Sequence, residues 1–125
     1  MKNPEQDPEK MLPLTPAVFH ILLALADKER HGYGIMQEVA FRTDGKLRMG
    51  PGTLYGSIKR MIADGLITES GERPDPSLDD ERRRYYRLTS FGQRVAQAEA
   101  QRLAQLLHVA QIKHLLPGLD MTGGA

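Results

Sequence analysis

One segment near the N-terminus constrains the fold more than any other, because a helix from Thr15 to about Asp27 has almost no polar face. Thr15 can cap this helix with its hydroxyl, and Pro16 suits the first turn, where its missing N–H costs nothing. A helix that is apolar on nearly all sides must be covered on more than one side. In a chain of 125 residues this predicts burial under a second chain or under an appended helix. The main apolar stripe comprises Leu14, Val18, Ile21, Leu22 and Leu25, and Phe19, Leu23, Ala24 and Ala26 widen it.

A helix from Pro51 to Gly65 has a different character, because its expected outer face is small and basic. Pro51 suits the first helical position, and Gly65 is a natural helix stop. The outer face carries no carboxylate before Asp64, which favours close approach to an anionic surface such as the DNA major groove. A solvated amphipathic helix is the alternative. The apolar stripe comprises Leu54, Ile58, Met61 and Ile62, and the outer face comprises Gly52, Thr53, Gly56, Lys59, Arg60 and Ala63.

Basic residues are concentrated in two segments, although the net charge of the whole chain is only +1. From Arg42 to Arg60 there are five basic residues and one acid, and from Arg82 to Arg102 there are six and one. The acids lie mainly near the N-terminus and between residues 69 and 81. This uneven distribution favours a nucleic-acid partner more than the net charge does.

Composition excludes several classes of protein. The chain has no cysteine, which removes disulfides, thiolate metal sites and cysteine nucleophiles. No apolar run reaches the roughly 20 residues of a membrane helix, and the N-terminus lacks the apolar stretch of a signal peptide. We therefore expect a cytoplasmic protein that does not associate with membranes.

Local signals predict the helices and turns around these segments. Residues 1–12 are polar and contain two prolines, so we expect a flexible tail. A helix is expected from His31 to about Arg42, followed by a turn at residues 43–45 and a very short strand at residues 46–49.

The second half of the chain predicts a β-hairpin and a long final helix. Strands at residues 66–70 and 82–88 flank a loop that is rich in proline and acids. Either Thr89 or Ser90 can cap the last helix, which can run to about Leu116. The expected fold is mostly α-helical with a small β-hairpin (α+β). It comprises a winged helix-turn-helix domain at residues 13–88, a C-terminal dimerisation helix at residues 89–117 and a flexible tail at residues 118–125.

Apolar residues on the last helix recur at intervals of four and three, as they do in a coiled coil. Such a helix is too long to be covered by so small a domain, so we expect it to pair with a second copy of itself. Alternatively, it folds back over the first helix. The repeat comprises Ala96, Ala100, Leu103, Leu107 and Ala110, and the predicted dimer interface comprises Leu22, Ala100, Leu103, Leu107 and Ala110.

Four sequence motifs, in this order and spacing, resemble the PadR family of bacterial transcriptional regulators over roughly residues 14–116. One departure is Gly56, where the family commonly has proline; it bears on the rigidity of the first turn of the recognition helix. The resemblance implies a winged helix-turn-helix repressor that forms a homodimer through its C-terminal helices. It also implies that the affinity for DNA can change when a small ligand binds. The motifs are His31-Gly32-Tyr33-Gly34-Ile35, Gly52-Thr53-Leu54-Tyr55, the run from Arg60 to Ile67, and Arg83-Arg84-Tyr85-Tyr86-Arg87-Leu88-Thr89 followed by Gly92.

Candidate contacts with double-stranded DNA lie on the helix that begins at Pro51, on the hairpin and, for Tyr33, at the start of the helix before them. An arginine can donate two hydrogen bonds to guanine, and hydroxyls near a helix N-terminus can bind phosphate oxygens. The two tyrosines can equally be half-buried core, and the arginine run can equally pair with Asp79, Asp80 and Glu81. The candidates are Tyr33, Thr53, Tyr55, Ser57, Lys59, Arg60, Arg82, Arg83 and Arg84.

An enzyme is a poor alternative for this sequence. His20, His31, His108 and His114 lack the i, i+4 spacing that aims two imidazoles at one metal ion. We expect no catalytic residues, no metal site and no cofactor. A winged-helix protein-interaction module without DNA binding remains the alternative function.

A small apolar or aromatic effector is the last expected partner. An apolar cleft can form where the first and last helices of two subunits meet. Each of its residues can equally be ordinary dimer core. The candidate lining residues are Phe19, Leu22, Leu103, Leu107 and Val109.

Overall fold

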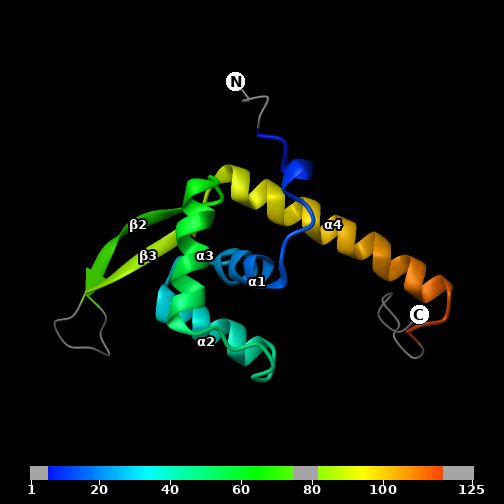
Figure 1. Cartoon of the computed structure of the whole chain (residues 1–125), viewed down its shortest axis with the longest axis horizontal. Helices are drawn as coiled ribbons and strands as arrows, with labels where there is room; N and C mark the ends of the chain where they lie inside the picture. Colours follow the sequence, from blue (N-terminus) through cyan, green and yellow to red (C-terminus); the bar gives the residue numbers. More distant parts are fainter. Residues whose placement is uncertain (1–5, 75–81, 117–125) are drawn as a thin grey trace.

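The computed structural model describes residues 6–74 and 82–116. In this part of the chain, four α-helices pack with a small antiparallel sheet, whose β2–β3 hairpin lies at one edge, and the fourth helix extends away from the domain (Figure 1). The fold class expected from sequence is confirmed. The elements are a 3₁₀ helix η1 (Pro8–Met11), α1 (Pro16–Leu25), β1 (Arg30–His31), α2 (Gly32–Arg42), α3 (Pro51–Ala63), β2 (Ile67–Pro74), β3 (Arg82–Leu88) and α4 (Ser90–Ile112).

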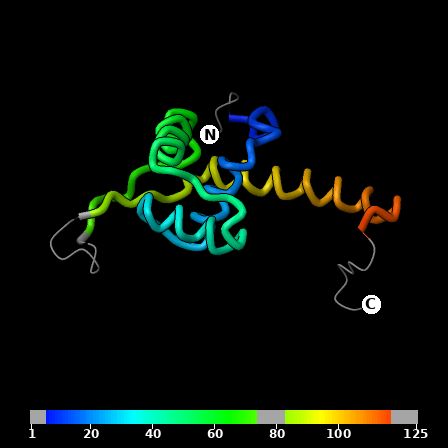
Figure 2. Tube along the Cα trace, turned by 60° about the horizontal axis from the view of Figure 1, so that its bottom comes forward, coloured from blue at the N-terminus to red at the C-terminus, as the bar shows by residue number. Residues whose placement is uncertain are grey.

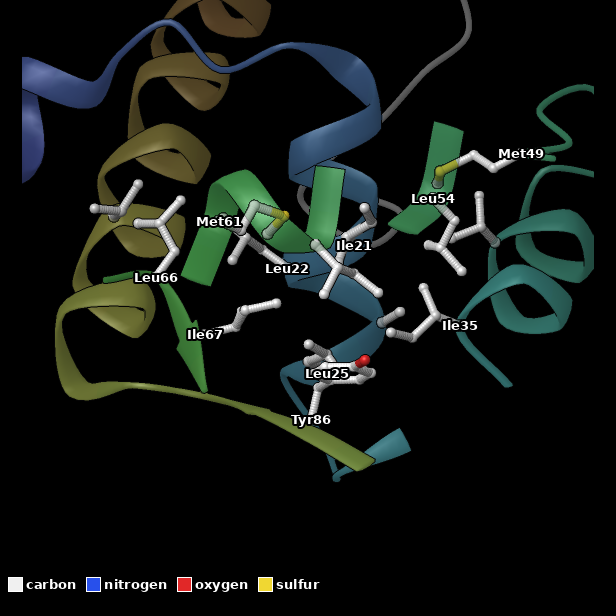
Figure 3. Close-up of a cluster of buried hydrophobic side chains, with 14 of the residues drawn as sticks. Ile21, Leu22, Leu25, Ile35, Met49, Leu54, Met61, Leu66, Ile67 and Tyr86 are labelled. Carbon is white, nitrogen blue, oxygen red and sulfur yellow. The ribbon is translucent and has the colours of Figure 1, made fainter. Parts of the chain in front are cut away.

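Helix α1 lies at the centre of the domain and contacts α2, α3, α4 and β3 (Figure 1). Thr15 caps it by accepting a hydrogen bond from the N–H of Val18, as its sequence predicts. Ile21, Leu22 and Ala24 have no exposed surface. Of the two kinds of cover expected from sequence, a second chain or an appended helix, the structure shows the appended helix, because α4 packs against α1. Figure 3 shows the core that Ile21 and Leu22 share with α2, α3 and the sheet.

Strand β3 is the central strand of the sheet, between β1 and β2. The hairpin of β2 and β3 pairs from Ile67 opposite Leu88 to Pro74 opposite Arg82, with a bulge between Glu69 and Gly71. Strand β2 is therefore longer than its sequence predicts. The tip of the hairpin lies outside the described residues.

The prediction of a strand at residues 46–49 is wrong. The third strand is instead the short β1, whose Arg30 lies opposite Tyr86 on β3. Residues 46–49 have no strand partner; the hydroxyl of Thr43 accepts a hydrogen bond from the N–H of Leu47, and Met49 is buried in the core.

Helix α3 begins at Pro51 and ends before Gly65, whose φ of 77° is easily adopted only by glycine. Leu54, Ile58 and Met61 are buried, as their spacing predicts. Ile62 is 39% exposed, so its assignment to the buried stripe is wrong.

Helix α4 is capped by Thr89 and not by Ser90, because the Thr89 hydroxyl accepts a hydrogen bond from the N–H of Gly92. The helix ends at Ile112, four residues before the expected end. His114 then adopts a left-handed conformation with φ of 60°.

Residues 7–14, which we call the N-terminal segment, are folded, contrary to the flexible tail expected for residues 1–12. The 3₁₀ helix η1 packs on α4, and Leu12 contacts the core. The carboxylate of Glu99 accepts a hydrogen bond of 2.9 Å from the N–H of Leu14 and pairs with Arg102. Residues 1–5 lie outside the described part of the chain. None of the helices in residues 6–74 and 82–116 is long and apolar enough to span a membrane.

Candidate nucleic-acid interface

The outer face of α3 is exposed and carries no buried residue. Thr53, Lys59 and Arg60 are all exposed, and a Cβ added to Gly52 or Gly56 would meet nothing within 4 Å. No side chain caps the N-terminus of the helix at Gly50. The first N–H groups of α3 can therefore bind an anion, such as a phosphate oxygen.

Two of the candidate residues are tyrosines, Tyr55 on α3 and Tyr33 near the start of α2. Tyr55 is 45% exposed, and its ring packs so closely on Gly32 that a Cβ there would lie 2.2 Å from the phenol oxygen. Tyr33 is 47% exposed, and the guanidinium of Arg83 lies 5.3 Å from the centre of its ring. Each tyrosine is thus half-buried against the domain while its remaining surface is open to a partner.

The arginines of the hairpin do not all have the same surroundings. The guanidinium of Arg84 pairs with Glu69 at 3.1 Å and with Glu72 at 3.7 Å. Arg83 stacks on Tyr33 on the other face of the strand, and Arg82 begins β3. The alternative partners Asp79, Asp80 and Glu81 lie outside the described residues. In the described part of the chain, acids on the neighbouring strand are therefore the partners of Arg84.

An ion pair that the sequence does not predict holds the hairpin to the loop before α2. The Arg73 guanidinium donates a hydrogen bond of 2.7 Å to Glu29, and its Cζ atom lies 4.5 Å from the ring centre of Tyr85. This hydrogen bond lowers the pKa of Glu29. The sequence predicts a loop between residues 70 and 82, so no strand pattern around Arg73 indicates this role.

His31 also has a structural role that the sequence does not reveal. Its Nδ1 atom accepts a hydrogen bond of 2.9 Å from the N–H of Gly34 and thereby caps α2. The ring packs edge-on against Tyr85 at 5.2 Å. The His-Gly-Tyr-Gly motif thus sets the start of α2, and with it the position of Tyr33.

On its other side, α3 forms a groove with the N-terminal segment, which we call the α3 groove. Figure 2 shows the blue N-terminal segment and the green α3 on the same side of α4. Thr53, Ser57 and Arg60 follow one another at i, i+4 and i+7 and line the groove, whose volume is about 420 Å³. Met11 and Leu14 lie on the opposite wall. These two residues belong to the run Met-Leu-Pro-Leu. The apolar character of this run is the feature of the sequence that indicates a packed segment here.

The predicted dimer and ligand residues do not form one surface, because some are buried in the core and others are exposed. Leu22 has no exposed surface, so it belongs to the core of one chain and cannot contact a second chain or a ligand there. Leu103 and Val109 on α4 are 38% and 45% exposed. Neither the α3 groove nor a second groove of about 760 Å³ between the N-terminal segment and α4 is lined by Phe19, Leu103 or Val109.

His20 is an ionisable residue on α1, where its ring and its carbonyl both contact Arg42. Partial burial and the nearby Arg42 lower the pKa of His20, whose carbonyl accepts a hydrogen bond from the Arg42 guanidinium. Among the described residues, no three histidine or acidic side chains converge in a way that could hold a metal ion.

The three helices α1–α3 followed by the hairpin define a winged helix-turn-helix protein with an appended helix. Residues 21–98 match the transcriptional regulator PadR-like family. The chain belongs to this family of transcriptional regulators, which is not a family of enzymes.

Individual relatives agree with this assignment. A transcriptional regulator of Mycobacterium tuberculosis is 34% identical over 105 residues, which are 84% of this chain and 87% of the relative. A PadR family regulator from Clostridium difficile is 26% identical with a TM-score of 0.65, over 78% of this chain and 96% of that one. The structure of Bacillus subtilis PadR in complex with operator DNA has a TM-score of 0.57 at 21% identity, over 73% of this chain and 48% of that one.

Proposed function

We propose that this protein is a cytoplasmic homodimeric repressor that binds a nearly palindromic operator and is released by a small-molecule effector. The observation that carries DNA binding is the exposed, small and basic outer face of α3, with the tyrosines on one side and Arg60 on the other. The related Bacillus subtilis PadR, whose structure contains operator DNA, supports the same use of the fold.

Each candidate residue has a defined part in this proposal. Lys59 and Arg60 reach base edges or phosphates from α3, while Thr53 and Ser57 donate to phosphates near its N-terminus. Tyr33, Tyr55 and Arg83 contact the backbone on the side of the hairpin. Arg84 is already paired with Glu69 and Glu72, so a contact with DNA would compete with these two ion pairs. Arg82 stays among the proposed contacts as the first residue of β3.

The C-terminal half of α4 supports the proposed dimer. Leu106 and Ile112 on this helix are 55% and 61% exposed, and Leu115, three residues beyond its end, is 69% exposed. A cluster of large apolar residues on one projecting helix is typical of an interface with another chain. Ala100, Leu103, Leu107 and Ala110 form the proposed interface together with these residues. An effector cleft between α1 and α4 of two subunits, near Phe19, Leu103, Leu107 and Val109, remains part of the proposal.

Selection of bound DNA from a random pool by the purified protein, repeated at two salt concentrations, tests the function. We expect an enriched inverted repeat whose half-sites are separated by about 34 Å or a multiple of it. Affinity for the selected DNA should fall as salt rises, because bound phosphates release counterions. A pool without enrichment at either salt concentration would contradict sequence-specific binding.

A further inference from the structure

The α3 groove has an apolar floor and a size that suits a small molecule. Met61 and Leu66 at its base are 1% and 2% exposed, and Leu14 and Val18 add apolar surface from the side of α1. Its volume of about 420 Å³ lies within the range of about 300–1,000 Å³ for small-molecule sites. The body of a ligand in this groove would therefore be apolar.

The polar groups of the groove lie along α3. Arg60 makes no side-chain hydrogen bond or ion pair with any residue in the described ranges, and the hydroxyls of Ser57 and Thr53 line the groove on the same flank of the helix. Asp64 also lines the groove, one turn of helix beyond Arg60. One anionic group can pair with the guanidinium, whereas Asp64 would repel a second.

The wall opposite α3 is held in place from α4. The backbone N–H of Leu14 donates to the carboxylate of Glu99, which is 2% exposed and also paired with Arg102. Because a buried acceptor fixes the N-terminal segment, the groove is formed before any ligand enters. A preformed site binds a ligand without the cost of ordering its own walls.

We propose that the α3 groove binds a small organic monoanion with an apolar body, whose anionic group pairs with Arg60. This inference rests on the proposed function in one respect: Arg60 is also a proposed DNA contact, so ligand and operator compete for the same side chain. The site differs from the effector cleft between α1 and α4, because it is complete within one chain.

Titration of the full chain with the fluorescent anion 1-anilinonaphthalene-8-sulfonate tests the site without DNA. We expect saturable binding that Arg60→Gln weakens about tenfold, because a hydrogen-bonded charged group is lost. Lys59→Gln is the matched control, since Lys59 is an exposed cation on the same helix but does not line the groove; it should change the affinity less than about twofold.

A second pair of variants tests the location by filling space. Gly56→Leu places a side chain in the groove, where a Cβ meets no atom within 4 Å, and should abolish binding of the dye. Ala63→Leu adds the same side chain to the exposed face of α3 outside the groove and should leave binding intact. Circular dichroism of each variant shows whether the fold is kept.

Absence of dye binding to the native protein would overturn the proposal, and so would equal affinities for Arg60→Gln and Lys59→Gln. Unchanged binding to Gly56→Leu would place the dye elsewhere and overturn it as well. Displacement of the dye by selected operator DNA tests the competition separately. If no operator is found, the proposed function fails while the dye titrations still decide the groove.

Discussion

At the scale of single residues, the glycines of the family motifs are explained by close contacts. Gly32 leaves room for the ring of Tyr55, and Gly92 leaves room for the carbonyl of Leu66, which would lie 1.9 Å from an added Cβ. The Thr89 hydroxyl donates to the carbonyls of Gly65 and Leu66 at the same junction. The sequence places these glycines in motifs, but their partners are distant in the chain and are visible only in the fold.

Gly92→Ala and Gly56→Ala should change the free energy of unfolding in opposite directions. The Gly92 variant forces backbone atoms of Leu66 and α4 apart, so we expect a loss of about 2 kcal/mol or more. Gly56→Ala adds a Cβ to open space in a helix and should stabilise by about 0.5–1 kcal/mol. Urea unfolding followed by circular dichroism measures both, and equal effects would contradict the contact at Gly92.

Arg60→Ala should weaken binding to the selected operator. If Arg60 reads a base, we expect a loss of about 1–3 kcal/mol together with relaxed specificity at one position. If it holds a phosphate, binding to all sequences weakens similarly. The slope of log affinity against log salt concentration then becomes shallower by about one. Gel-shift titrations with operator and random DNA at two salt concentrations distinguish these results. An unchanged affinity would remove Arg60 from the interface.

At the scale of elements, segments with local start and stop signals were predicted well. Pro51 and Gly65 bound α3, and Thr15 starts α1, because caps, prolines and glycines act within one turn. Two of the differences from the sequence prediction depend on distant partners. Strand β1 exists because β3 lies beside it, and the N-terminal segment is folded because Glu99 accepts the N–H of Leu14. Neither partner can be recognised from the local sequence.

Glu99→Gln should destabilise the protein by about 2 kcal/mol at pH 7, because Arg102 loses its buried carboxylate partner. The hydrogen bond from Arg102 lowers the pKa of Glu99 below its ordinary value of 4.5. A lowered pKa in the folded state stabilises above the ordinary pKa, and this contribution is lost as pH falls through the lowered value.

The difference in unfolding free energy between the native protein and Glu99→Gln should therefore be constant from pH 7 to about 5 and shrink at lower pH. Urea titrations at fixed protein concentration measure it. Glu38→Gln is the matched control, because Glu38 pairs with Arg42 and Arg30 but its side chain is 29% exposed, so its loss should cost at most about 1 kcal/mol. A difference that persists undiminished at pH 3 would contradict the charged role of Glu99.

At the scale of the whole molecule, α4 leads away from the winged domain while the hairpin projects on the opposite side (Figure 1). The over-apolar α1 is covered by the first half of α4, so the fold needs no second chain for that purpose. Four of the exposed large apolar residues, Leu103, Leu106, Val109 and Ile112, lie on the second half of α4. The sequence predicted an apolar repeat there, but it could not show where the cover of α1 ends and the free surface begins.

Leu107→Asp should therefore reduce the mass measured by light scattering from that of a dimer to that of a single chain. A carboxylate in the proposed interface must be either desolvated without a partner or protonated, and both oppose association. His108→Asp introduces the same charge at the neighbouring exposed position, which lies about 100° around the helix from Leu107, and should leave the dimer intact. Loss of the dimer should also weaken operator binding, because one recognition helix then reaches only one half-site. If both variants keep the dimer mass, α4 is not the dimer interface; if both lose it, general charge repulsion explains the result.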